Sequence, residues 1–188
     1  MHPVSPTYQV TMENTDLNQA IEMYRRHPRH GFASLYRVLS GRIATFVKRA
    51  FGLGADEVAD VVHDCFLPWV EEPERMAKVE NPRAYLFSTA KYLAIQRRRA
   101  EARIAPGDSG SELEETANAG EGHARQTETS LDVAAALDRL PDDQREVVAL
   151  KIWGDLTFEE IAAVQEVSLN TAASRYRYAL QKLKEILA

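Results

Sequence analysis

The chain has 188 residues, 45% of them hydrophobic, and a formal net charge of −5 at pH 7. This length suits one ordinary domain or two small ones, and the composition is that of a globular protein with a real core. No stretch approaches the roughly 20 apolar residues that cross a bilayer, and the N-terminus lacks the charged start and apolar run of a signal peptide. We therefore expect a cytoplasmic protein without membrane insertion.

The single cysteine, Cys65, excludes a disulfide within the chain, in agreement with a reducing compartment. His63 lies two residues before it, which raises the alternative of a metal site. A tetrahedral zinc site needs four ligands, however, and the sequence has no second cluster of Cys and His. We interpret Cys65 as a buried thiol on a helix and expect neither a metal nor a cofactor.

The charges are sorted along the chain. Residues 81–103 hold six Lys or Arg and one acid, and residues 167–184 hold four Lys or Arg and no acid. Between them, residues 106–130 hold six acids and one base. The acidic total argues against nucleic-acid binding, but the two local basic patches favour it.

Residues 106–130 also mark a boundary, because they are rich in Gly, Ser, Thr and Glu and contain no aromatic residue. Such a segment buries too little apolar area to offset its ordering entropy, so we predict a flexible acidic linker. Helical periodicity is common elsewhere and strand patterns are nearly absent. The predicted fold is all-α, with two small helical domains over 31–105 and 131–188 after an N-terminal extension, 1–30.

Apolar residues at three- and four-residue spacing predict the helices of the N-terminal part. These helices are Asp16–Arg26 with Thr15 as its cap, Phe32–Ala50, a helix that starts near Ala55, and a helix that continues to about Arg103. Pro68 falls inside the third pattern, so that helix must kink or stop there. Residues 71–80 read as a loop. Asn81 then caps the last helix, and Pro82 occupies its first position.

The C-terminal part has clearer helix signals. The predicted helices are 131–140, a second one opened by Pro141 and closed by Gly154, a third opened by the capping box Thr157–Glu160, and a last one from the cap Ser168 to about Leu187. The second helix should bury Val147, Val148, Leu150 and Ile152. The inward face of the last helix should comprise Ala172, Tyr176, Ala179, Leu180, Leu183 and Leu187.

The last two helices have helix-turn-helix spacing, with a short helix, a tight turn and a longer helix. Polar side chains opposite the apolar face of the last helix could reach base edges, and its basic residues could contact phosphates. The candidate DNA-binding residues are Ser168, Asn170, Thr171, Ser174, Arg175, Arg177, Tyr178, Gln181 and Lys182. The alternative is the solvated face of an ordinary helical bundle.

Two further helix faces carry suggestive patterns. Tyr85, Tyr92, Gln96 and Arg99 fall on one arc beside Arg97, Arg98 and Arg103. Aromatic rings among positive charges suit single-stranded nucleic acid, although a tyrosine-rich core edge beside solvated arginines explains the composition equally well. The helix before it has an acidic outer face that includes Leu67, which suits either solvent or a docking protein.

Taken in order, four strings of the sequence resemble the extracytoplasmic-function sigma factors of bacterial RNA polymerase. The strings are DVVHDCFLPW over residues 60–69, NPRAYLFSTAKYLAI over 81–95, LDRLPDDQREVVAL over 137–150, and VSLNTAASR over 167–175. The resemblance covers about residues 31–104 and 131–187. Each string is modest, but their joint order and spacing are highly specific.

The resemblance implies a non-enzymatic protein that directs the polymerase to promoters. It places Asp60, His63, Asp64 and Leu67 on the clamp of the largest polymerase subunit. The loop around 74–81 and the following helix would melt the minus-ten element and hold a flipped base. The minus-ten residues it implies are Asn81, Arg83, Tyr85, Lys91, Tyr92, Gln96, Arg97, Arg98 and Arg99.

The same resemblance implies that the helix from Ser168 reads the minus-thirty-five element as duplex DNA. The acidic linker would thread the RNA path of the polymerase. An anti-sigma factor is the expected regulatory partner, and the protein would be associated with the nucleoid when bound to polymerase.

Three positions depart from the family pattern. Pro68 interrupts a helix that is normally continuous, which would end the docking face early. His63 replaces the usual Gln, which would make docking mildly pH-sensitive. Ala173 stands where the family often has Lys, so the neighbouring arginines would carry more of the DNA contact.

Two other classes of protein explain less of the sequence. A stand-alone helix-turn-helix repressor or activator explains residues 131–187 but not the aromatic and basic helix of the N-terminal domain. An enzyme would need a phosphate-binding glycine loop, a nucleophile with a base, or a metal cluster, and the sequence offers none of these patterns.

Overall fold

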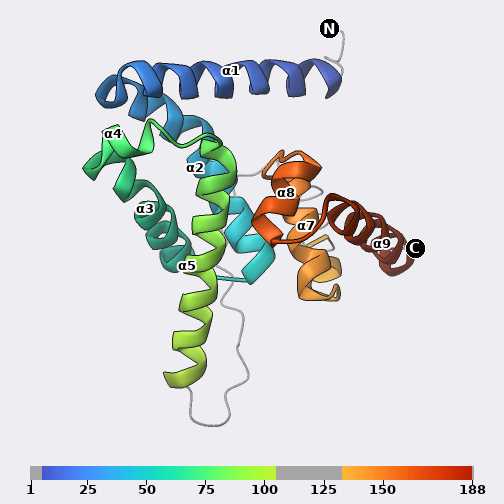
Figure 1. The fold of residues 1–188 in the computed structure, drawn as a ribbon. Helices are drawn as coiled ribbons and strands as arrows, with labels where there is room; N and C mark the ends of the chain where they lie inside the picture. Colours follow the sequence, from blue (N-terminus) through green and yellow to red (C-terminus); the bar gives the residue numbers. More distant parts are fainter. Residues whose placement is uncertain (1–5, 105–132, 188) are drawn as a thin grey trace, which may run out of the picture.

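The computed structural model describes residues 6–104 and 133–187, and all regular structure within these ranges is helical (Figure 1). The all-α prediction is therefore confirmed, with an N-terminal and a C-terminal helical domain. The predicted linker, residues 106–130, lies outside the described residues.

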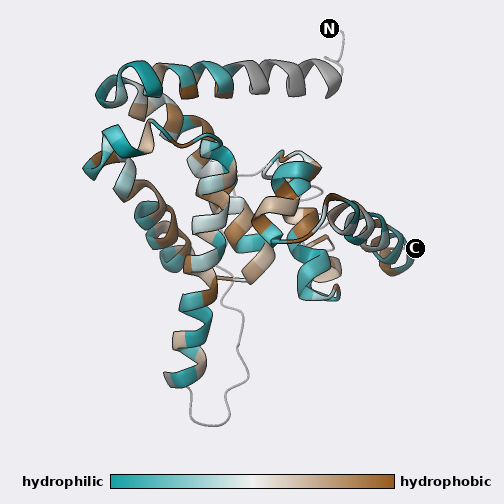
Figure 2. Cartoon of the chain, viewed as in Figure 1, coloured by the Kyte–Doolittle hydropathy of each residue, from teal (hydrophilic) through white to brown (hydrophobic). Residues whose placement is uncertain are grey.

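The N-terminal domain is a helical bundle. Its elements are α1 (Pro6–Arg26), α2 (Pro28–Phe51), α3 (Ala55–Glu71), α4 (Pro73–Met76) and α5 (Pro82–Ile104). The hydrophobic residues of α2, α3 and α5 meet in the core, and the end of α5 toward Ile104 is mostly hydrophilic (Figure 2). Fully buried side chains at this contact include Leu39, Ile43, Phe46, Val61, Cys65, Leu86 and Phe87.

Helix α1 starts ten residues earlier than the predicted Asp16, so Thr15 lies inside the helix and is not its cap. The helix packs closely on α2: a Cβ on Gly31 would lie 2.4 Å from Tyr24 Cα, so only glycine permits this approach. The buried Tyr24 hydroxyl donates a hydrogen bond of 2.6 Å to the carbonyl of Trp69 in α3. The end of the predicted extension is thus an integral part of the N-terminal domain.

Helix α3 does not stop at Pro68 but continues to Glu71. Proline removes one backbone donor, yet the side chain of Trp69 is only 1% exposed and anchors the last turn in the core. Residues 71–80 are not all loop either, because Pro73 opens the short helix α4. Asn81 caps α5 as predicted, since its Oδ1 accepts the Ala84 N–H at 2.9 Å.

The C-terminal domain comprises a helical stretch over 133–138, then α7 (Asp142–Ile152), α8 (Phe158–Gln165) and α9 (Leu169–Leu187). The capping box is confirmed: Thr157 Oγ1 accepts the Glu160 N–H at 3.2 Å, and Glu160 Oε2 accepts the Thr157 N–H at 2.8 Å. Ser168 Oγ caps α9 by accepting the Thr171 N–H at 3.1 Å.

Three side chains predicted to be buried are exposed instead: Ile152 is 52%, Leu180 41% and Leu187 53% accessible. Ile152 ends α7, and the two leucines lie in the second half of α9. Helical spacing predicted a full apolar face along α9, but within the part of the chain that the structure describes, Leu180 and Leu187 lie outside the buried part of that face. Ala172 and Ala179 are the side chains of α9 that are fully buried.

The two domains pack against each other. Helix α7 contacts α2, and α8 contacts α5, so that α8 lies between α5 and the rest of the C-terminal domain (Figure 1). Buried side chains of both domains belong to one continuous hydrophobic cluster. Helix α9 lies on the side of the C-terminal domain away from α5 (Figure 1).

Candidate nucleic-acid and polymerase interfaces

The predicted minus-thirty-five face of α9 is open to solvent. Seven of its nine candidate residues are exposed, namely Ser168, Asn170, Thr171, Arg177, Tyr178, Gln181 and Lys182. The Arg177 guanidinium lies 5.6 Å from the centroid of the Tyr178 ring, so the cation rests on an aromatic side chain. This face joins polar hydrogen-bonding groups to positive charge on one exposed helix.

The other two candidates, Ser174 and Arg175, are half-buried. Arg175 Nε lies 3.0 Å from Asp143 Oδ2 in α7, and its Nη1 donates to Gln165 Oε1 in α8 at 3.3 Å. Arg175 therefore joins α9 to both α7 and α8. Sequence reasoning assigned it to DNA alone, because nothing in the spacing of residues indicated Asp143 as its partner.

The predicted minus-ten residues of α5 divide into two groups. Tyr92 is 62% exposed, and Gln96, Arg98 and Arg99 also face solvent. The remaining residues contact protein. Tyr85 packs edge-on against Trp69 with ring centroids 6.0 Å apart, and Arg97 reaches α3. Asn81, Arg83 and Lys91 point to the C-terminal domain.

Arg83 forms the central contact between the domains, and it is only 8% exposed. Its Nε and Nη2 donate to the two carboxylate oxygens of Glu160 at 3.0 and 2.6 Å, and its Nη1 donates to the Asp155 carbonyl at 3.0 Å. Asn81 Nδ2 donates to Glu160 Oε1 at 3.0 Å. Burial alone would raise the pKa of the Glu160 carboxyl, but the hydrogen bonds from Arg83, Thr157 and Asn81 outweigh it and lower that pKa.

Lys91 forms a second contact of this kind. Its Nζ lies 2.8 Å from Glu146 Oε1 in α7, a close ion pair without good hydrogen-bond angles, and donates to the Val164 carbonyl at 3.3 Å. Burial raises the pKa of Glu146, and the nearby Lys91, Gln165 and Arg175 only partly oppose it. Glu146 and Glu160 thus lie at the same interface with pKa values shifted in opposite directions.

Two more polar contacts complete the interface. Arg42 Nη1 of α2 lies 3.5 Å from Asp155 Oδ2, and Arg145 Nε of α7 donates to the Ala50 carbonyl at 3.0 Å. Sequence reasoning missed all of these pairs. Glu160 carried the signal of a capping box, and that signal gives no indication of a partner 77 residues away.

The predicted polymerase-docking face on α3 is partly engaged within the protein. Arg97 donates to Asp60 Oδ2 and to Asp64 Oδ2, each at 3.0 Å. His63 and Leu67 remain exposed, Leu67 at 38%. Val70 is 57% exposed three residues beyond Leu67, on the same side of the helix. Sequence reasoning missed Val70, which lies just past the string over residues 60–69 that carried the resemblance.

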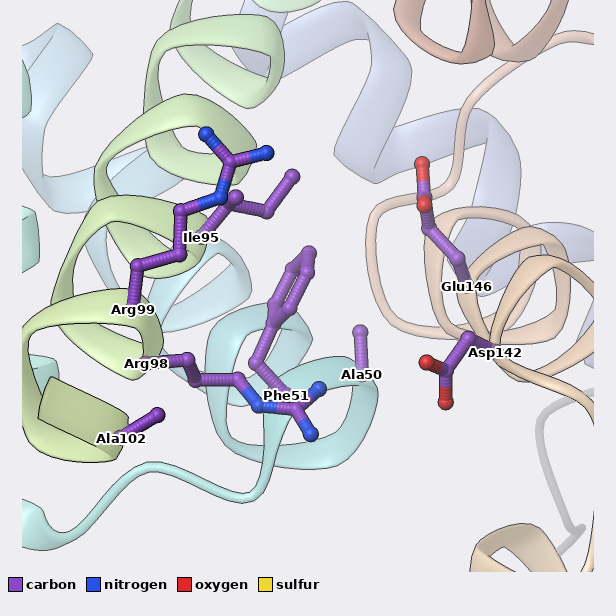
Figure 3. Close-up of a pocket in the computed structure, with 8 residues that line it drawn as sticks. All are labelled: Ala50, Phe51, Ile95, Arg98, Arg99, Ala102, Asp142 and Glu146. Atoms are coloured by element: carbon purple, nitrogen blue, oxygen red, sulfur yellow. The ribbon is translucent and has the colours of Figure 1, made fainter. Parts of the chain in front are cut away.

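A pocket of about 390 Å³ lies between α5 and α7, over the end of α2. Figure 3 shows Arg98, Arg99 and Ile95 on the α5 side and Asp142 and Glu146 on the α7 side, with Phe51 and Ala50 between them. Its two walls carry opposite charges. The pocket marks the open edge of the interface between the domains.

Cys65 is fully buried, and burial, together with the neighbouring Asp64, raises the pKa of its thiol to about 12. Both effects favour the protonated thiol over the thiolate. Among the residues that the structure describes, no three His, Cys, Asp or Glu side chains are placed to hold a metal ion. None of the described helices is both long and apolar enough to cross a membrane.

The fold and its two basic helices can be compared with known proteins. The family model of sigma-70 region 2 matches residues 35–104, and the model of sigma-70 region 4 matches residues 130–183. The chain is 28% identical to the ECF RNA polymerase sigma factor SigK of Mycobacterium ulcerans, over 92% of this chain and 94% of that protein. It is also 42% identical over 50 residues to the ECF RNA polymerase sigma factor RpoE of Cereibacter sphaeroides, which covers 27% of this chain and 28% of that protein.

Two solved structures share the fold. The sigma factor RpoE in complex with the anti-sigma factor NepR from Bartonella quintana matches with a TM-score of 0.61 and 20% identity, over 83% of this chain and 96% of that chain. CnrH in complex with the cytosolic domain of CnrY matches with a TM-score of 0.61 and 23% identity, over 92% and 97%. The chain belongs to the sigma-70 family and, within it, to the extracytoplasmic-function sigma factors, which are non-catalytic transcription initiation factors that recognise promoters.

Proposed function

We propose that the two regions divide promoter recognition between duplex and single-stranded DNA, and that the exposed face of α9 reads the minus-thirty-five duplex. Asn170, Thr171 and Gln181 offer short polar groups to base edges, and Arg177 and Lys182 meet phosphates. The observation that carries this assignment is the solvent exposure of seven of the nine candidate residues on one helix. Arg175 acts mainly by holding α9 on α7 and α8.

Region 2 would open the minus-ten element with the loop before α5 and with α5 itself. Tyr92 offers a ring for stacking, and Arg98 and Arg99 neutralise the backbone beside it. A base inside a duplex hides its Watson–Crick edge, so reading it in this way requires extrusion. Asn81, Arg83 and Lys91 can join this surface only when region 4 has moved away, because they are held by it here.

The outer side of α3 would dock on the clamp of the largest polymerase subunit. Leu67 and Val70 form an exposed apolar pair, with His63 one turn before Leu67. An exposed apolar pair among acids is the composition expected of a docking surface. Asp60 and Asp64 add negative charge, although they also pair with Arg97.

An anti-sigma factor is the proposed regulatory partner, because the solved structure of RpoE, which shares the fold, contains the anti-sigma factor NepR. As a partner of RNA polymerase, the protein would act in the cytoplasm, associated with the nucleoid when bound to the polymerase. The alternative of a stand-alone repressor finds no support in the comparisons.

Run-off transcription tests the proposal. Purified protein and bacterial core polymerase are combined on fragments of the source genome, and transcripts should appear only when both proteins are present. Their start sites define the minus-ten and minus-thirty-five elements directly. A protein that shifts duplex DNA alone, as a dimer and without transcripts, would instead be a repressor.

A further inference from the structure

The interface between the domains covers part of the surface that region 2 needs for DNA. Asn81, Arg83 and Lys91 all donate hydrogen bonds to the C-terminal domain. Arg83 is 8% exposed, and the carboxylate that it contacts, Glu160, is 9% exposed. In this arrangement no nucleic acid can reach the Arg83 guanidinium.

Each oxygen of the Glu160 carboxylate accepts two hydrogen bonds, as the oxygens of a bound anion would. Oε1 accepts from Arg83 Nε and Asn81 Nδ2, each at 3.0 Å, and Oε2 accepts from Arg83 Nη2 at 2.6 Å and the Thr157 N–H at 2.8 Å. Two parallel N–H donors from one guanidinium form the fork that binds a carboxylate or a phosphate in the same way. The two groups are therefore interchangeable at Arg83.

We propose that Glu160 is an intramolecular competitor of promoter DNA: its carboxylate occupies the place that a backbone phosphate of the opened minus-ten strand takes on Asn81 and Arg83. The proposal rests on the function proposed above for the start of α5. Region 4 then blocks single-strand binding in the free protein, and separation of the domains releases the site. Glu160 thus has two roles: it completes the capping box at the start of α8, and it blocks the proposed DNA site of region 2.

The chemistry of the contact suits a reversible block. In a buried ion pair, attraction and lost hydration nearly cancel, so separating both partners into water has a small net cost. The supporting pairs Lys91–Glu146 and Arg42–Asp155 are of the same type. Separation must also part the apolar side chains that the two domains share in one cluster, so a partner that binds either domain in the separated arrangement supplies that free energy.

Glu160→Gln in the full-length protein is the sharpest test. Glutamine at this position still completes the capping box of α8, so the motif stays folded while Arg83 loses the negative charge that faces it. Glu159→Gln is the matched control, because it removes the same charge from the same helical turn. Glu159 is exposed, and among the described residues no hydrogen bond or ion pair joins it to region 2.

The readout is fluorescence anisotropy with a labelled single strand, the nontemplate minus-ten strand of a promoter mapped by run-off transcription. We expect the free Glu160→Gln protein to bind it about tenfold more tightly than the wild type, a change of about 1.4 kcal/mol. Small-angle scattering should show an increased radius of gyration for Glu160→Gln. Glu159→Gln should match the wild type in both measurements.

Equal affinity of Glu160→Gln and wild type would overturn the proposal, and so would a gain that persists in the double variant Arg83→Ala/Glu160→Gln. Run-off transcription by holoenzyme that contains Arg83→Ala distinguishes a failure of the competition from a failure of the proposed minus-ten function. Defective transcription with no effect of Glu160→Gln overturns the competition alone. Normal transcription by Arg83→Ala removes Arg83 from the minus-ten site, and the competition is then overturned with it.

Discussion

The two basic helices of the protein, α5 and α9, have similar compositions but different surroundings. On α9, Arg177 and Lys182 face solvent. On α5, Arg83 and Lys91 are paired with acids of the other domain, while Arg98 and Arg99 are exposed at the open edge of the interface. Charge count alone would treat the two helices as equivalent nucleic-acid surfaces. Their neighbours leave the cations of α9 accessible, whereas those at the start of α5 are covered.

This difference shows which basic residues the acids of the chain neutralise. Glu146, Asp155 and Glu160 each pair with a cation of region 2 across the interface. An acid that neutralises a basic surface within the same chain lowers its nonspecific attraction to nucleic acid until the domains separate. The net charge of −5 is therefore compatible with two DNA-binding regions.

The largest effect is expected where the covered helix loses one partner. Arg83→Met leaves the buried Glu160 carboxylate without its guanidinium, and removing one side of a buried pair costs about 3 kcal/mol or more. Urea unfolding should show this loss. The double variant Arg83→Met/Glu160→Gln should recover most of it, and Arg98→Met, at the exposed edge of the interface, should stay within about 0.5 kcal/mol of the wild type. A double variant as unstable as Arg83→Met would contradict the pairing.

A smaller effect is expected at the part of α5 that stays open. Tyr92→Ala removes an exposed ring, and loss of base stacking costs about 1–3 kcal/mol. Permanganate footprinting of the polymerase–promoter complex should show reduced strand opening, while duplex binding stays unchanged. Tyr92→Phe keeps the stacking surface and should restore opening. An equal loss of duplex binding and opening in Tyr92→Ala would argue against a melting role.

On α9, two neighbouring arginines should behave differently. Arg177→Ala should weaken binding of holoenzyme to duplex promoter DNA by about 1 kcal/mol and reduce the salt dependence by about one phosphate contact, with no change in thermal stability. Arg175→Ala should also lower the melting temperature, because it loses Asp143 and Gln165. If both variants are equally stable, Arg175 does not hold the domain together.

Most of the fold could be predicted from local sequence. The cap Asn81 and the capping box at Thr157 located the helix starts, since a cap depends on residues three positions apart. The start of α1 at Pro6 was not predicted. At Pro68, where the sequence predicted a kink or a stop, tertiary contacts such as that between Tyr24 and Trp69 decide that the helix continues.

The candidate site was predictable only as a set of residue types. Helical spacing placed Arg177 and Tyr178 on an exposed face, and they are exposed. It could not separate Arg83 from Arg99, because their difference lies in a partner helix that is distant in sequence. The approach of the two domains depends on complementary charges at scattered positions, and no local pattern encodes that.

The smallest effects are expected in the pH dependence of stability, to which two carboxyl groups of the interface, Glu146 and Glu160, contribute. The pKa of Glu160 is lowered by Arg83, Thr157 and Asn81 despite burial, so its contribution to stability is present above its ordinary pKa of 4.5 and is lost as pH falls through the lowered value. Burial raises the pKa of Glu146, so the protein gains stability as pH falls from the raised value toward 4.5.

Melting temperatures of wild type, Glu160→Gln and Glu146→Gln across acidic pH should separate the two. Glu146→Gln should remove the gain above 4.5, because the buried group that takes up the proton is then absent, and Glu160→Gln should flatten the loss below it. Since the two contributions have opposite signs, the wild-type profile should be flatter near 4.5 than that of either variant. Parallel profiles for all three proteins would mean that neither carboxyl is buried between the domains in solution, and the covered face of α5 would then be as open as that of α9.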